Sequence, residues 1–258
     1  VQNDLVGLFK MPIKFQVHYR DGSMAEVTEW IQKESETVVI PNTSLKKVDY
    51  ILFDPNSNIL KKVKFDRPYK TLLVQAQKAK NLMDRYDAVE AMKDMEVDKK
   101  REDLIELYLE EEHQALKQSI LLQLKDDDHP KTEQLYVYAL GEKNVKVRRT
   151  AIDNLKIKSK RYIKFYEEML HDESYVNAEK ALIVLCKEYP VMTKEYLYRT
   201  RHLGNENVSF KLTWLKLTFG KQKVLYSEIA DYATESFDFR TRIKAMKILG
   251  EIGYSENT

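Results

Sequence analysis

A repeated pattern with a period near 30 residues constrains the fold of this chain more than any other feature. Each copy has a small residue, an apolar residue directly after it and, in all copies but one, another apolar residue three positions further on. The small residues are Ala91, Ser119, Ala151, Ala181, Thr213 and Ala245, at spacings of 28, 32, 30, 32 and 32. Such positions share one face of a helix, and a small side chain lets a second helix approach closely. This period is typical of an α-solenoid.

A second helical pattern precedes each copy, so the sequence predicts about six helix pairs over residues 68–258. In these segments apolar residues recur at intervals of three and four. The first helices of the pairs are expected at Tyr69–Lys80, Lys99–Glu111, Pro130–Leu140, Ser159–Leu170, Val191–Leu203 and Lys223–Ser236. Pro68 marks the start of this region, because proline is well tolerated at the beginning of a helix.

Residues 1–67 have the period-two alternation of β-strands instead. Strands are expected at Met11–Tyr19, Met24–Ile31, Thr37–Ile40, Val48–Phe53 and Ile59–Phe65. Asp21-Gly22 predicts a hairpin turn, and Asp54-Pro55-Asn56 predicts a second turn. Five short strands suggest a small antiparallel β-sandwich. Its core is thin, so we expect it to lean on the helices or to lack strands upstream of Val1.

The composition and the motifs point to no active site in the chain. The formal net charge is only +2, which favours no class of charged partner. The histidines form no H-E-x-x-H helix and, with Cys186 the only cysteine, no set of converging metal ligands. There is no glycine-rich phosphate loop and no G-x-S-x-G motif. No apolar run approaches the roughly 20 residues that span a bilayer.

One stretch, from Asn144 to Lys164, is strongly basic. It contains a single acid, Asp153, and eight bases: Lys146, Arg148, Arg149, Lys156, Lys158, Lys160, Arg161 and Lys164. Such a patch can bind a nucleic-acid phosphate or a substrate carboxylate, or it can be a solvated outer face. Arg148 and Arg242 both lie three residues before a small residue, and this recurrence favours a structural ladder of arginines paired with neighbouring acids.

Two segments resemble the aminopeptidase N family of zinc metallopeptidases. The first, Leu8–Tyr19, has a Phe-x-x-Pro strand opening (Phe9, Pro12). The second, Asp49–Phe65, has a Phe-Asp-Pro turn and a Leu-Lys-Lys strand, formed by Phe53, Asp54, Pro55, Leu60, Lys61 and Lys62. Lys80–Met92 is similar to the first helical repeat of that family. The family's G-x-M-E-N and H-E-x-x-H motifs are missing. The resemblance therefore implies a C-terminal fragment without the catalytic domain: a β-sandwich (1–67) followed by a HEAT- or armadillo-like helical domain (68–258).

The resemblance implies a non-catalytic region that covers the active-site cleft and shapes peptide access. Its partners would be the upstream catalytic domain, which would hold the zinc, and peptide substrates. Neither a membrane nor a nucleic acid is expected as a partner, and no cofactor is expected in this chain. Arg240, Arg242 and Arg148 are candidate contacts to a peptide's C-terminal carboxylate, although each can instead pair with acids between repeats. The alternatives are a HEAT-repeat protein-interaction scaffold and a nucleic-acid-binding solenoid that uses the Lys146–Lys164 patch.

Overall fold

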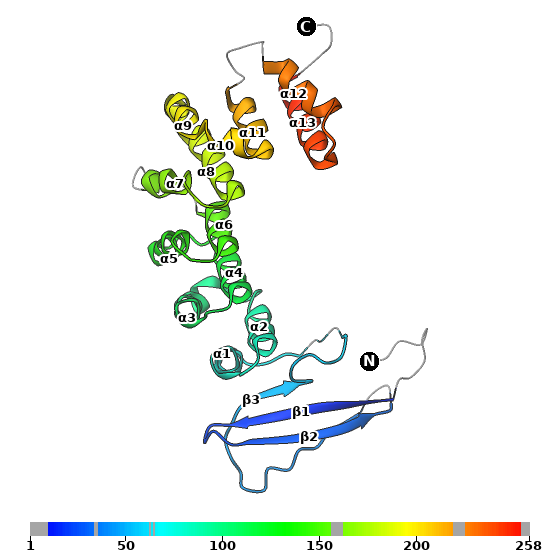
Figure 1. Cartoon of the computed structure of the whole chain (residues 1–258). Helices are drawn as coiled ribbons and strands as arrows, with labels where there is room; N and C mark the ends of the chain where they lie inside the picture. Colours follow the sequence, from blue (N-terminus) through cyan, green and yellow to red (C-terminus); the bar gives the residue numbers. More distant parts are fainter. Residues whose placement is uncertain are drawn as a thin grey trace. The chain divides into compact units, whose positions relative to one another are not determined.

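The computed structural model describes residues 10–33, 36–61, 63, 65–155, 162–218 and 225–253. Within these residues the chain is mostly helical, with thirteen α-helices and one three-stranded antiparallel sheet (Figure 1). The predicted class, mainly α with a small β part, is confirmed. The chain divides into two compact units, Val1–Asp127 and Asp128–Thr258. The first unit contains the sheet and four helices, so the helices that follow Pro68 begin within the same unit as the strands.

The sheet lies in the first unit and has a central strand paired on both edges. Its strands are β1 (Met11–Tyr19), β2 (Met24–Ile31) and β3 (Val48–Phe53), in the order β2-β1-β3. The predicted Asp21-Gly22 turn joins β1 to β2, and Gly22 has a φ of +81°, which glycine adopts without strain. Tyr50 and Leu52 of β3 are buried against Ala79, directly after α1 (Tyr69–Lys78). The sheet therefore packs against the end of α1, which adds to the thin core of three short strands.

The expected strand at Thr37–Ile40 is absent from the described residues. Its surroundings form a loop, because the Asn42 amide bonds the backbone of Lys46 in both directions, at 2.9 and 3.0 Å. Leu45 has a positive φ of 48°, which a strand does not accept. Val39 is 74% exposed, so its apolar side chain is not part of a core.

The described part of Ile59–Phe65 forms no strand either. The carboxylate of Asp54 accepts the backbone N–H groups of Asn58 and Ile59 at 3.2 and 3.0 Å, which removes donors that a strand would use. Lys62 and Lys64 lie outside the described residues. A single sheet of three strands therefore occupies the described part of residues 1–67, and the five-stranded sandwich is not confirmed.

The four helices of the first unit pack in two pairs. They are α1, α2 (Leu82–Ala91), α3 (Val97–Glu110) and α4 (Gln114–Gln123). Helix α1 packs on α2 and α3 packs on α4, while α1 also contacts α3 and α2 contacts α4. The pairs therefore stack with first helix against first helix and second against second. Lys100 on α3 is buried within this stack and donates to the carbonyls of Met92 and Lys93, both at 2.8 Å.

The second unit continues the alternation with nine described α-helices. They are α5 (Pro130–Leu140), α6 (Val145–Asn154), α7 (Ile163–Met169), α8 (Tyr175–Glu188), α9 (Thr193–Thr200), α10 (Leu203–Glu206), α11 (Val208–Thr218), α12 (Leu225–Thr234) and α13 (Phe239–Glu251). The second helices contact one another in series, α6 with α8, α8 with α11 and α11 with α13. The helix expected at Val191–Leu203 is divided, because Pro190 starts a short 3₁₀ helix, η2 (Pro190–Met192), before α9.

The repeated small residues mark buried positions in five of the second helices but not in α2. Ser119, Ala151, Ala181, Thr213 and Ala245 are all buried. Ala91 ends α2 and is exposed, whereas Ala88, three residues earlier, is fully buried. The register assigned to this copy from the sequence is therefore wrong by three residues. The sequence allows both registers, because the buried Met92 lies four residues after Ala88 and also directly after Ala91.

Candidate functional site

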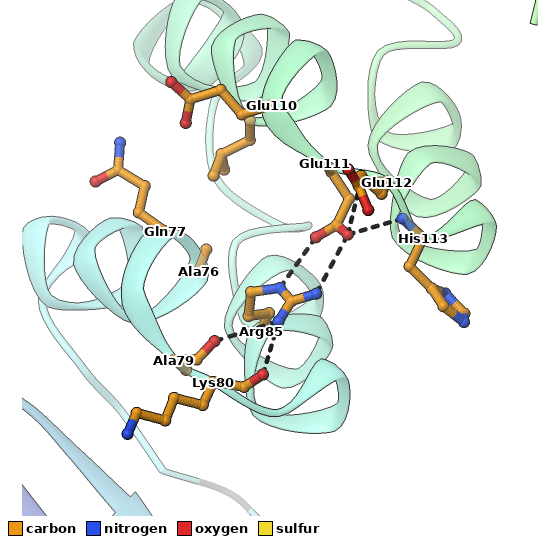
Figure 2. A pocket seen from close by; sticks show the side chains of 10 residues that line it. Ala76, Gln77, Ala79, Lys80, Arg85, Glu110, Glu111, Glu112 and His113 are labelled. Carbon is orange, nitrogen blue, oxygen red and sulfur yellow. Dashed lines mark hydrogen bonds and ion pairs between the residues drawn. The ribbon is translucent and has the colours of Figure 1, made fainter.

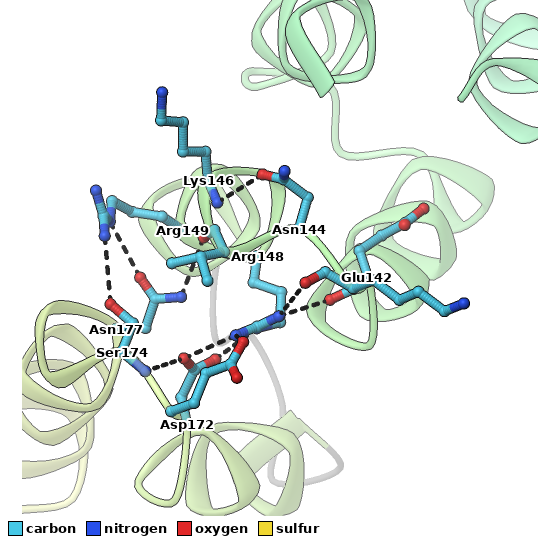
Figure 3. A network of polar contacts seen from close by, with 11 residues as sticks. Glu142, Asn144, Lys146, Arg148, Arg149, Asp172, Ser174 and Asn177 are labelled. Carbon is cyan, nitrogen blue, oxygen red and sulfur yellow. Dashed lines mark hydrogen bonds and ion pairs between the residues drawn. The ribbon is translucent and has the colours of Figure 1, made fainter. Parts of the chain in front are cut away.

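Arg148 on α6 is the centre of a polar network that reaches the loop before α8 (Figure 3). Its Nε and Nη2 donate to the two carboxylate oxygens of Asp172 at 2.6 and 3.0 Å, and Nη2 also donates to Glu173 at 3.0 Å. Its Nη1 donates to the carbonyls of Glu142 and Lys143 at 2.8 and 2.9 Å. These contacts use all five N–H donors of a guanidinium. Arg148 is thus a clamp between two helix pairs, as the structural alternative predicts.

The carboxylate of the clamp is well held despite its burial. The Asp172 side chain is 2% exposed. Burial raises the pKa of its carboxyl, but hydrogen bonds from Arg148 and from the backbone N–H of Ser174 outweigh this effect, and the pKa lies below its ordinary value. The hydrogen bonds that Asp172 accepts in turn raise the pKa of Arg148. The ion pair is therefore fully charged at neutral pH.

Arg85 on α2 forms a matching clamp in the first unit (Figure 2). Its Nε and Nη2 donate to the carboxylate of Glu111 at 3.0 and 3.2 Å, and its Nη1 donates to the carbonyls of Ala79 and Lys80 at 3.3 and 3.1 Å. Arg85 lies three residues before the buried Ala88, the same spacing as Arg148 before Ala151. Sequence reasoning missed this clamp because the copy was aligned on Ala91 and not on Ala88.

A hollow of about 680 Å³ surrounds the Arg85 clamp, between α1, the start of α2 and the end of α3. Lys80, Glu110, Glu112 and His113 line it together with Arg85 and Glu111 (Figure 2). His113 is engaged locally, since its Nδ1 accepts the backbone N–H of Ala115 and so caps α4. Within the described lining there is no serine or cysteine nucleophile beside a base. Of the charged groups here, Arg85 and Glu111 hold helix ends together.

Of the basic stretch Asn144–Lys164, the two described arginines, Arg148 and Arg149, are both engaged in contacts between helices. Arg149 donates to the side chains of Asn177 and Ser174 at 3.0 and 3.3 Å, so it holds α8 and its first turn against α6. Lys164 lies over the ring of Phe165. Four of the eight bases, Lys156, Lys158, Lys160 and Arg161, lie outside the described residues. Of the described arginines in the patch, Arg148 thus pairs with acids as the structural alternative predicts, and Arg149 contacts neutral side chains of the next pair.

Arg240 and Arg242, the other two candidate carboxylate contacts, lie on the first turn of α13. Arg240 is exposed, with its guanidinium over the ring of Phe239. Arg242 is half-buried, and its Nη1 donates to the carbonyl of Ser236 at 3.0 Å. Within the described residues neither arginine has an ion pair with a carboxylate. The structure therefore leaves these two guanidinium groups, unlike that of Arg148, with donors available to an external anion.

The Phe-Asp-Pro turn of the resemblance is a second buried polar centre, at the end of β3. Asp54 is 3% exposed and forms an ion pair with Lys61. Besides accepting N–H groups of its own loop, this turn contacts α2, because the backbone N–H of Asn56 donates to Asp84 at 3.3 Å. Asp54 adopts a positive φ of 51°, a conformation that asparagine and aspartate tolerate better than most residues. The turn is thus connected to Lys61 of the following Leu-Lys-Lys segment and to α2.

The described residues contain no group of three or more histidine, cysteine or acidic side chains placed to hold a metal ion. Cys186 is buried, and burial raises the pKa of its thiol. None of the described helices combines the length and the apolar character that crossing a membrane requires. Comparisons with protein-family models and with curated proteins gave no match.

Proposed function

We propose that this chain is the non-catalytic C-terminal region of a zinc-dependent aminopeptidase of the aminopeptidase N type and that it shapes peptide access to the catalytic domain. The observation that carries the proposal is the Asp54 turn. The motif residues Asp54 and Lys61, seven positions apart in the sequence, meet in one ion pair, in which the carboxylate is buried, at the border of the sheet and α2. A sheet joined to helix pairs in this way suits a fragment that follows a catalytic domain, whereas a plain helical scaffold has no need of the sheet.

The proposed function also implies a more specific architecture for the helix pairs and for the sheet. Helix pairs that contact their neighbours in series are the building principle of solenoids. We propose that the pairs form a HEAT- or armadillo-like superhelix and that the three strands belong to a sandwich completed by upstream residues. A solenoid surface suits the task, because its second helices expose side chains that can vary without disturbing the packing.

In this proposal Arg242 and Arg240 are the candidate contacts to the C-terminal carboxylate of a bound peptide. A peptide whose N-terminus is held at zinc directs its other end away from the metal. An arginine binds such a carboxylate with two parallel hydrogen bonds, worth roughly 1.5–3 kcal/mol for a charge-assisted contact. Arg148 is the weakest of the three candidates, because its donors are already used by Asp172, Glu173 and two carbonyls.

The first test is the coding sequence upstream of Val1. The proposal expects an H-E-x-x-H motif with a downstream glutamate, and an upstream sequence without it would contradict the proposal. The same reasoning predicts that the chain alone retains no zinc after dialysis and cleaves no aminoacyl arylamide. Stoichiometric zinc together with chelator-sensitive cleavage would overturn that prediction.

The second test uses the full-length parent enzyme. Arg242→Ala and Arg240→Ala are each compared on a peptide and on the same peptide with an amidated C-terminus. Loss of an anchor should erase the preference for the free carboxylate in kcat/KM, by about tenfold or more. Arg201→Ala, which also removes an exposed arginine, is the matched control and should keep the preference. If all three variants keep the preference for the free carboxylate, neither Arg242 nor Arg240 binds the carboxylate, and the helical region does not form a carboxylate-binding surface through them.

Two other functions make different predictions. If the chain is a HEAT-type scaffold without peptidase activity, no zinc motif should precede it and it should bind a stable protein partner. A nucleic-acid-binding solenoid expects affinity for DNA or RNA that falls steeply with salt. The engagement of Arg148 and Arg149 in helix contacts gives that last function little support.

A further inference from the structure

Helix α13 exposes the face that the earlier second helices of the unit use to contact the next pair. Positions are numbered from the buried small residue of each helix. At position −2, Arg149 of α6 bonds Asn177 of α8, and Lys211 of α11 pairs with Glu228 of α12. Glu179 of α8 accepts hydrogen bonds from Ser209 and Thr213 of α11. In α13 the same position is Ile243, which is apolar and 46% exposed.

Position +1, directly after the small residue, is likewise covered in the earlier second helices and exposed on α13. Ile152 and Leu182 are buried at this position in α6 and α8. Trp214 of α11 is partly buried and packs on the core cluster that α11, α12 and α13 share. Met246 of α13, in contrast, is 55% exposed. Position −2, which contacts the following helix pair in α6 and α11, and position +1, which is buried or partly buried in α6, α8 and α11, are therefore both uncovered on α13.

These positions join into a continuous apolar stripe. Phe239, Ile243 and Met246 are spaced four and three residues apart, which places them on one face of the helix, and Phe239 is 57% exposed. The opposite face carries Ala245 and Ile248, which are buried in the core of the last pair. The stripe is thus the outer face of a helix whose inner face is already packed.

Charge selects the kind of partner that fits the stripe. Lys247, at position +2, is exposed beside the stripe. Arg240 is exposed on the same edge of α13, about two turns before Lys247. In α6 the +2 position is Asp153, and it pairs with Lys180 of the following second helix at 2.6 Å. By the same pairing, a helix that covers α13 should carry an acidic residue opposite Lys247. Two copies of α13 packed antiparallel and face to face would instead bring their Lys247 and Arg240 edges together, and like charges repel each other.

We propose that the Phe239–Ile243–Met246 stripe of α13 is a docking surface for an amphipathic α-helix of a partner protein whose apolar face is flanked by carboxylates. The helix lies along α13 as the second helices of the unit lie along one another. Its apolar residues cover the stripe, and its carboxylates pair with Lys247 and Arg240. This surface is separate from the proposed peptide-access role and does not depend on it.

The test measures binding of labelled helical probe peptides to the chain by fluorescence anisotropy. One alanine-based peptide of about 20 residues carries leucines at i, i+4 and i+7 with flanking glutamates. Its twin has lysines in place of the glutamates. The glutamate peptide should bind at least about tenfold more tightly than the lysine peptide, and its affinity should fall as salt is added. Equal binding of the two peptides, or no binding, would overturn the proposal.

Variants locate the surface. Ile243→Asp should abolish binding, and Lys247→Glu should reverse the preference between the two peptides. Leu109→Asp removes an apolar side chain that is similarly exposed, on α3, and should change nothing. Because Ile243 and Lys247 are solvent-accessible, circular dichroism should show that both variants keep their helical content. Light scattering on the unmodified chain tests the competing occupant, since a dimer that Ile243→Asp dissociates would show that a second copy covers the stripe and would overturn the proposal.

Discussion

Helices α6 and α13 both carry an arginine at the same repeat position, but the two arginines make different contacts. Arg148 and Arg242 both lie three residues before a buried alanine, and both donate from Nη1 to the carbonyl six residues earlier, in Glu142 and Ser236. Arg148 also binds Asp172 through two hydrogen bonds, whereas within the described residues Arg242 has no carboxylate partner. The arginine therefore does two separable jobs. It closes the turn within its own pair, and it binds the next pair only where that pair supplies an acid.

The first job recurs in the other unit as well. Arg85 donates to the carbonyl of Ala79, six residues earlier, and pairs with Glu111. The acid follows its arginine by 26 residues here and by 24 residues in the Arg148 clamp, so the pairing does not require one fixed spacing. Loop residues that follow a helix pair can thus supply the acid from slightly different positions.

The largest effect is expected for the complete clamp. Arg148→Ala removes the partner of a buried carboxylate and leaves Asp172 uncompensated, which should lower the free energy of unfolding by about 3–5 kcal/mol. The measurement is chemical denaturation followed by circular dichroism. Arg240→Ala, which removes an exposed arginine of the same unit, is the control and should shift the midpoint little. A loss below about 1 kcal/mol for Arg148→Ala would mean that the clamp is not a major source of stability.

A smaller effect is expected from the buried small residues. Ala88→Leu should lower the free energy of unfolding by about 1–3 kcal/mol, because the added atoms overpack a fully buried position on α2. Ala91→Leu adds the same atoms to the same helix at an exposed position and should have almost no effect. Ala151→Leu and Ala181→Leu should behave like Ala88→Leu. Equal midpoints for the Ala88 and Ala91 variants would restore the register that the sequence alone suggested.

The helical elements could be predicted from the sequence because each one buries a regularly spaced apolar face. Pro130–Leu140 was predicted with its observed bounds, and the Ala151 and Ala181 copies were placed correctly. The strand Thr37–Ile40 was wrong, because alternation over four residues is too short to outweigh local hydrogen bonds such as those of Asn42. The copy at Ala91 was wrong because Met92, the buried apolar residue four positions after Ala88, also directly follows Ala91.

The candidate site was less predictable than the fold. The slot shared by Arg148 and Arg242 suggested a ladder, and the structure gives Arg148 that role. The acid that completes the clamp could not be chosen from the sequence, because Asp172 is one of many acids and lies 24 residues away. Only the packing of α6 against α8 brings the two together. The exposure of Ile243 and Met246 likewise depends on which helix follows, which a local pattern does not encode.

The clamp should also make stability depend on pH. Because the folded state holds the pKa of Asp172 below its ordinary value, its contribution is present above the unfolded pKa of about 3.9 and is lost as the pH falls through the folded pKa. Denaturation midpoints of the unmodified chain and of Arg148→Ala should therefore converge as the pH is lowered from about 6 to about 3. A difference that stays constant over this range would exclude the ionised Asp172 as the main partner.

The smallest effect is expected for Arg242→Ala, which removes an incomplete clamp. Arg242 loses one hydrogen bond to the carbonyl of Ser236, and a single hydrogen bond contributes about 0.5–1.5 kcal/mol. Because Arg242 is only half-buried, water can replace its side chain at that carbonyl, so we expect a loss below about 1 kcal/mol. Arg148 and Arg242 lie in the same compact unit, so the same unfolding transition reports both variants. A loss for Arg242→Ala as large as that for Arg148→Ala would show that closing the turn, and not the ion pair with the next helix pair, carries the stability of these arginines.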